Sequence, residues 1–74
     1  MRAPLQVKQL IAEFVKRDVA TLDDGQVLRE LVMDSFRLVE LVMILQERLD
    51  VIVNQEDLAH VRTVGDLTAV FAAL

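Results

Sequence analysis

The sequence lacks cysteine, tryptophan and tyrosine altogether, and its 74 residues include only three phenylalanines. Without cysteine there is no disulfide framework, no thiolate metal site and no thiol nucleophile. No apolar run approaches the length of a membrane span, and the N-terminus lacks the apolar region of a secretion signal. We therefore expect a cytoplasmic protein that does not enter membranes, with a core built from aliphatic side chains.

The composition favours one small folded domain. Hydrophobic residues make up 54% of the chain, which excludes a disordered, solvating sequence. A chain of 74 residues has room for only one core, and that core is marginally sufficient. We therefore expect residues 1–74 to form a single domain.

The formal net charge of −4 is unevenly distributed. Four basic residues and one acid give +3 in residues 1–17, whereas eleven acids and four arginines give −7 in residues 18–74. An acidic body argues against nucleic acid, whose phosphates attract basic residues. It suits docking to basic patches on other proteins, although the same charge also serves solubility.

The longest helical pattern runs over Met33–Leu49 and contains neither Gly nor Pro. Five of its residues follow the spacing of one buried stripe: Leu38, Leu41, Val42, Leu45 and Leu49. The far side mixes apolar and acidic residues: Phe36, Met43, Ile44, Glu40 and Glu47. This second apolar face has two interpretations, because either a loop covers it or a partner protein docks there and is selected by the carboxylates.

Further elements precede this helix. A first helix begins at Pro4, whose missing N–H costs nothing in a first turn, and ends near Arg17. Its inward residues are Val7, Leu10, Ile11 and Phe14. The long connection over residues 18–34 has a turn at 23–25 and apolar anchors that suit a short helical turn around 27–31. A connection of this length lets the first two long helices run antiparallel. Its acidic residues do not form a calcium site, because the spaced oxygen ligands of a calcium loop are missing.

The last third of the chain completes the predicted fold. Residues 50–54 are β-branched, but no second strand exists to pair with them, so we interpret them as an extended connection. A short helix over residues 55–60 begins at Asn54 or Gln55. Thr63 and Asp66 have the spacing of a capping box that starts a final helix. Its inward residues are Leu67, Val70, Phe71 and Leu74. The expected fold is all-α, a small four-helix bundle with three longer helices, one short helix and a long first loop.

The start of the 33–49 helix is the chemically distinctive part of the sequence. Asp34 suits the N-cap position, which leaves the Ser35 hydroxyl in the first turn, free and near solvent. A helix N-terminus carries partial positive charge and unpaired N–H groups, so a phosphate attached there is favourably placed. A serine at a helix start is by default only a cap, and its neighbours in the sequence decide whether it is more.

Those neighbours resemble the acyl carrier proteins and the related peptidyl carrier proteins. The hallmark of that family is Asp-Ser-Leu at the head of a second helix. Here the sequence reads Asp34-Ser35-Phe36, followed by Val39-Glu40-Leu41-Val42-Met43. The resemblance continues through residues 49–53, 56–57 and 62–67, and it covers the first thirty residues by pattern and length alone.

The resemblance implies that Ser35 carries 4′-phosphopantetheine, attached by a separate phosphopantetheinyl transferase that also contacts Asp34. The chain would hold acyl or aminoacyl groups as thioesters on this arm and present them to an acyl- or aminoacyl-loading enzyme, an acyltransferase or a ketosynthase. It would be a monomer and not an enzyme, with no metal, nucleic acid or membrane among its partners. The implied docking residues are Phe36, Arg37, Glu40, Met43, Ile44, Glu47, Glu56 and Asp57.

Several positions depart from the family pattern. Phe36 replaces the common Leu after the serine, and Val32 stands where Gly is frequent. Arg37, Gln46 and Arg48 occupy positions that tend to be acidic in carriers of bulk fatty acid synthesis. These departures favour a dedicated carrier in a specialised polyketide or nonribosomal, aminoacyl pathway over a general fatty acid carrier, with the choice depending on the partner.

Two other classes of protein compete with a carrier. A hydrolase would need Ser35, Asp34 and His60, the chain's one histidine, but nothing in their spacing brings His60 to the serine. A helical adaptor would bind another protein through the second apolar face. That interpretation accounts for the apolar face, but not for a serine that directly follows an aspartate at the helix start.

Overall fold

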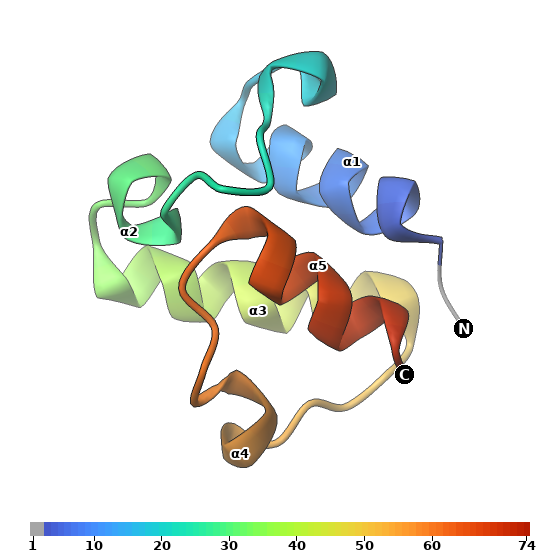
Figure 1. The fold of residues 1–74 in the computed structure, drawn as a ribbon. Helices are drawn as coiled ribbons and strands as arrows, with labels where there is room; N and C mark the ends of the chain where they lie inside the picture. The colour runs from blue at the N-terminus through green and yellow to red at the C-terminus, as the bar shows by residue number, and fades with distance from the viewer. Residues whose placement is uncertain (1–2) are drawn as a thin grey trace.

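The computed structural model describes residues 3–74, which form three longer helices and three short ones (Figure 1). The longer helices are α1 (Pro4–Val15), α3 (Ser35–Leu49) and α5 (Val64–Ala72). The short ones are the 3₁₀ helix η1 (Val19–Thr21), α2 (Leu28–Leu31) and α4 (Gln55–Leu58). The predicted all-α bundle with three longer helices is confirmed, and the helical turn expected around 27–31 is present as α2.

The arrangement explains the length of the first loop. α1 and α3 run in roughly opposite directions, so the chain must travel back along the bundle between them (Figure 1). α1 packs against both α3 and α5. It ends at Val15, two residues before the expected end, because Lys16 adopts a left-handed conformation with φ 59°. The Lys16 N–H then bonds the last helical carbonyls, which closes the helix.

The core is aliphatic apart from one aromatic ring. Its most deeply buried large side chains are Phe71, Ile11, Leu28, Leu41, Leu45, Leu67, Val7 and Val64. The stripe expected on α3 is buried at Leu41, Leu45 and Leu49 and half-buried at its other two positions. The prediction that Leu74 points inward is wrong, because α5 ends at Ala72 and the Leu74 side chain is exposed beyond it.

Backbone hydrogen bonds tie the first loop to the start of α5. The Leu28 N–H donates to the Arg62 carbonyl and the Val64 N–H donates to the Gln26 carbonyl, both at 2.9 Å. These two bonds make an isolated antiparallel bridge, and no strand longer than a bridge occurs within residues 3–74. The two bonds hold this part of the chain against α5, and its Leu22 and Leu28 side chains lie in the core.

The connection from α3 to α5 is extended, as the sequence predicts. Val53 is buried and its N–H donates to the Gln46 side-chain oxygen at 2.8 Å, which holds the connection against α3. Asn54 is the N-cap of α4 and forms a capping box with Asp57. The predicted capping box of Thr63 with Asp66 is also present at the start of α5.

Candidate functional site

Ser35 is the first residue of α3, and its side chain is exposed. Asp34 is the N-cap, as predicted, and its Oδ1 accepts the Phe36 N–H at 2.9 Å. The cap bond is made by the carboxylate of Asp34, not by the Ser35 hydroxyl. Within residues 3–74 no hydrogen bond reaches the Ser35 Oγ, so this hydroxyl is free to react. The structure thus places one accessible hydroxyl at the tip of the longest helix, beside a fixed carboxylate.

The electrostatics of this tip suit a phosphate. An α-helix leaves its first N–H groups without partners inside the helix, and its N-terminus carries partial positive charge. Asp34 satisfies the N–H of Phe36 only, so the first turn retains the character of an anion site. A phosphodiester on the Ser35 oxygen would lie at this positive end, and the exposed side chain leaves the space that such a group needs.

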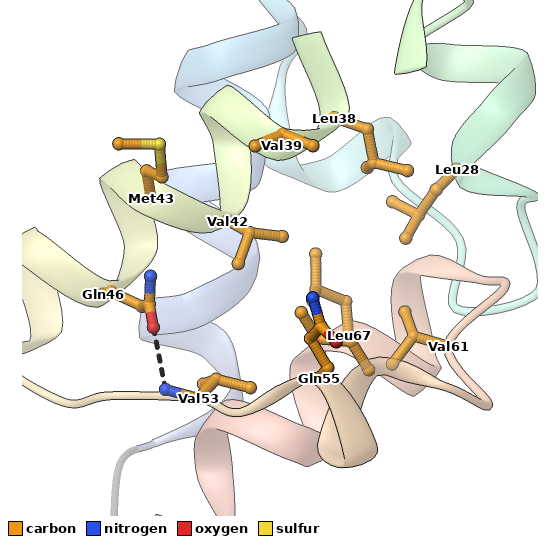
Figure 2. A pocket seen from close by; sticks show the side chains of 11 residues that line it. Leu28, Leu38, Val39, Val42, Met43, Gln46, Val53, Gln55, Val61 and Leu67 are labelled. Atoms are coloured by element: carbon orange, nitrogen blue, oxygen red, sulfur yellow. Dashed lines mark hydrogen bonds between the residues drawn. The ribbon is translucent and has the colours of Figure 1, made fainter. Parts of the chain in front are cut away.

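An apolar cleft opens on the same side of α3 (Figure 2). Its volume is about 360 Å³. α3 lines one side, α4 and the segments on either side of it line the other, and Leu28 of α2 and Leu67 of α5 complete the lining. Ser35, Val39, Val42 and Gln46 follow an i, i+4, i+7, i+11 spacing, so they share one stripe of α3. The cleft therefore begins about one helical turn beyond the serine, on the face from which the serine projects.

Of the residues described by the structure, nine apolar residues and two glutamines line this cleft. The Gln46 amide oxygen is directed at the Val53 N–H, so Gln46 closes the cleft at the α3–α4 connection (Figure 2). Gln55 extends from the start of α4 toward α3. The cleft suits an apolar group that enters from solvent. Sequence analysis missed it, because its two walls lie in different parts of the chain.

The residues expected to form a docking face divide into two groups. Phe36, Glu40, Met43 and Glu47 are exposed on one side of α3, so the idea that a loop covers Phe36 is wrong. Ile44 is half-buried at the margin of that side, since it lies closer around the helix to the buried stripe than Met43 does. Sequence analysis overlooked three strongly exposed apolar residues: Met33, Val39 and Ile52.

Arg37 and the acidic residues of α4 have structural contacts of their own. The Arg37 guanidinium lies 4.5 Å from the centre of the Phe14 ring on α1 and 3.5 Å from the Glu40 carboxylate. Asp57 accepts the Asn54 N–H at 3.2 Å within the capping box. Glu56 is exposed beside it and makes no ion pair within the described part of the chain. Arg37 and Asp57 are therefore less free for a partner than their exposure suggests.

The described residues do not assemble a catalytic or metal constellation. His60 lies exposed in the turn after α4, and within residues 3–74 no hydrogen bond joins it to Ser35 or Asp34. Across the same residues, no three His, Cys, Asp or Glu side chains converge as a metal site would require. Within residues 3–74, no helix is long and apolar enough to cross a membrane.

Comparison with protein families gives a match that covers most of the chain. The family model described as "Phosphopantetheine attachment site" matches residues 6–71. The match spans far more than half of the 74 residues, and the chain belongs to this family. No curated protein sequence matches the chain. Members of the family carry covalently attached 4′-phosphopantetheine, and such domains work with modifying and biosynthetic enzymes.

Family membership makes this chain a phosphopantetheine-bearing carrier protein. The geometry around Ser35 fits the group, because the hydroxyl is exposed at a helix N-terminus that favours a phosphate. When bound, the group supplies a flexible tether with a terminal thiol that forms thioesters. The contribution of the chain is to hold the tether at one defined point and to offer a surface to the enzymes that act on it.

Proposed function

We propose that Ser35 is the attachment residue and that the protein carries acyl or aminoacyl intermediates on the arm bound to its Oγ. The observation that carries this proposal is the exposed hydroxyl of Ser35 at the first position of α3, beside the Asp34 cap. Ser35 is also the one serine in the sequence. In the attachment reaction the Oγ displaces the nucleotide part of coenzyme A from the phosphate next to the pantetheine, and the hydroxyl proton passes to the transferase.

The apolar cleft supports an acyl cargo of modest size. Its volume of about 360 Å³ lies at the low end of the range for small-molecule sites, about 300–1,000 Å³. Val39 and Val42 line it on the same stripe as Ser35, so a cargo on the arm has an apolar surface within one to two turns of the attachment point. A charged cargo would gain nothing there, because the lining residues include no charged side chain.

The pathway that we favour is a specialised one, polyketide or nonribosomal, with a phosphopantetheinyl transferase, a loading enzyme and an acyltransferase or ketosynthase as partners. Positions 37, 46 and 48 carry Arg, Gln and Arg, where carriers of bulk fatty acid synthesis tend to have acidic residues. Arg37 pairs with Glu40, Gln46 accepts the Val53 N–H, and Arg48 is exposed. A loading assay tests this choice directly. The holo protein is offered acyl donors and aminoacyl donors with their cognate loading enzymes, and thioester formation is measured by intact mass.

The attachment site itself has a simpler test. The protein is incubated with coenzyme A, magnesium and a phosphopantetheinyl transferase of broad substrate range, and the intact mass is measured. We expect one added arm on the wild type and on Thr21→Ala, a matched loss of an exposed hydroxyl, and none on Ser35→Ala. Absence of the arm from the folded wild type, or its presence on Ser35→Ala, would refute Ser35 as the attachment residue.

Asp34 has two roles that a pair of variants separates. Asp34→Asn keeps a good N-cap but removes the charge, whereas Asp34→Ala removes both and costs about 1 kcal/mol of stability. If the carboxylate contacts the transferase, both variants are loaded more slowly than the wild type. If Asp34 acts only as a cap, Asp34→Asn is loaded at the wild-type rate.

A further inference from the structure

A second groove lies on the C-terminal half of α1, where η1 packs against the helix. It is open to solvent and has a volume of about 390 Å³. Ala12 is buried and Val19 is half-buried, so they give the groove an apolar floor, while its polar side chains are exposed. We call it the α1 groove, and its lining residues are Gln9, Ala12, Glu13, Lys16, Arg17 and Val19.

The two cations of the α1 groove have no acidic partner within residues 3–74. Lys16 and Arg17 are both exposed, and the ion pairs of the described chain involve other residues. Glu13 precedes Lys16 by three residues, a spacing that allows an ion pair on a helix. The two side chains do not pair here, and the helix ends between them at Val15. Both positive charges are therefore available to another molecule.

Lys16 also has an unusual backbone conformation. Its φ of 59° and ψ of 47° are left-handed, and glycine or asparagine is the usual residue at such a helix end because a Cβ is strained there. Asp50 has the same conformation at the end of α3, but aspartate is among the residues that tolerate it. Lysine is not. A strained residue of this kind points to a role for its side chain.

The α1 groove lies at the end of the bundle that carries Ser35. Figure 1 shows α1 ending on the side where α3 begins. The two helices are in contact there, since the Arg37 guanidinium in the first turn of α3 lies 4.5 Å from the centre of the Phe14 ring. Lys16 and Arg17 follow Phe14 within three residues. None of the groove residues belongs to α3 or lines the apolar cleft, so the two sites are separate.

We propose that the α1 groove binds an acidic segment of a partner protein. Residues 18–74 hold eleven acids and four arginines, a net charge of −7, so most of the surface repels such a segment and the α1 groove attracts it. The segment that fits carries carboxylates for Lys16 and Arg17 and a small apolar side chain for the floor. The inference goes beyond the proposed function, because it does not depend on an arm at Ser35.

The shape of the site favours a protein segment over an anionic membrane. Lipid surfaces are bound by clusters of about four to eight basic residues that reach a flat surface together. The α1 groove offers two free cations, an apolar floor and the amide of Gln9, which can hydrogen-bond a peptide backbone. A groove of this composition suits an extended or helical segment that enters it.

The test titrates the full chain, labelled with ¹⁵N and without an arm, with a synthetic 12-residue peptide of glutamate, alanine and leucine. We expect amide shifts that are concentrated in residues 9–19. Lys16→Gly and Arg17→Gln should each raise the Kd about two- to five-fold, the range for one exposed charge pair. The same peptide with glutamine in place of glutamate should not bind.

Each variant has a matched control at the far end of α3. Asp50→Gly relieves the same left-handed conformation as Lys16→Gly, and Arg48→Gln removes an exposed arginine that makes no ion pair within residues 3–74. Both controls should leave the Kd within about two-fold of the wild-type value. Because glycine is unstrained at this position, Lys16→Gly should melt at or above the wild-type temperature although it binds more weakly.

Four outcomes would overturn the proposal. They are a folded wild type that shows no shifts, an equal rise in Kd for Arg17→Gln and Arg48→Gln, an unchanged Kd for Lys16→Gly, and a Lys16→Gly protein that melts below the wild type. The last outcome would mean that Lys16 is kept for stability. Stronger binding to vesicles of phosphatidylglycerol than to the peptide would overturn the choice of a protein partner. None of these results bears on whether Ser35 accepts an arm, so failure of the proposed function is distinguishable.

Discussion

Gly65 allows the first loop to approach α5 closely, and adding one methyl group there should destabilise the fold. A Cβ at this position would lie 2.9 Å from the Asp24 Cβ and 3.1 Å from the Asp24 carbonyl oxygen. Asp24 cannot simply move away. Its carbonyl accepts the Gly65 N–H at 2.9 Å, and its carboxylate pairs with Lys8 at 3.0 Å. Gly65→Ala must therefore compress this contact and, because the same Asp24 carbonyl is involved, also weaken or break the hydrogen bond.

The expected loss in the free energy of unfolding follows from these contacts. Overpacking costs about 1–3 kcal/mol, and a lost hydrogen bond costs a further ~0.5–1.5 kcal/mol. In the opposite direction, alanine gains at most about 1 kcal/mol over glycine from helix propensity. The net loss is about 2 kcal/mol, which lowers the melting temperature by about 8–16 °C in a domain of this size.

Far-UV circular dichroism is the suitable assay, because the chain has no tryptophan or tyrosine for fluorescence. Gly25→Ala is the matched control, since Gly25 lies next to Asp24 in the first loop and a Cβ there meets nothing within 4 Å. We expect Gly25→Ala to be neutral, or more stable by up to about 1 kcal/mol through a less flexible unfolded chain. A Gly65→Ala protein that melts at or above the temperature of the Gly25→Ala protein would refute the close-contact argument.

Three further predictions concern polar groups. Thr68 is buried and its hydroxyl has no hydrogen-bond partner within residues 3–74, so Thr68→Val should raise the free energy of unfolding by about 1 kcal/mol in urea titrations. The backbone N–H of Arg62, more than any other group, holds the pKa of Asp66 below its usual value. The stability that ionised Asp66 contributes is therefore complete above the unfolded-state pKa and lost as the pH falls through the lowered folded-state pKa. The stability gap between wild type and Asp66→Asn should shrink over that acid range, and a gap independent of pH would contradict this. Gln46→Leu removes the acceptor for the Val53 N–H, so hydrogen exchange at Val53 should accelerate, whereas Gln46→Glu should keep it slow.

The sequence predicted the parts of the structure that depend on neighbouring residues. The helix over 35–49 follows from apolar spacing, and its start follows from Asp34, because an N-cap acts within one turn. The capping box of Thr63 and Asp66 follows for the same reason. The exposed Ser35 hydroxyl was therefore predictable, since it needs only a cap before it and solvent around it. The end of α5 was not, because no glycine or proline marks it.

Contacts between distant parts of the chain were decided by the tertiary structure alone. The apolar cleft exists because α4 and its flanking segments stand off from α3, and residues from Leu28 to Leu67 line it. The platform of Phe14 under Arg37 joins two helices that the first loop separates. Periodicity predicts which side of a helix is apolar. It does not predict which other element packs against that side, or how closely the two elements approach each other. The sequence thus predicted the exposed Ser35 hydroxyl at the start of α3, while packing determined the cleft beside it.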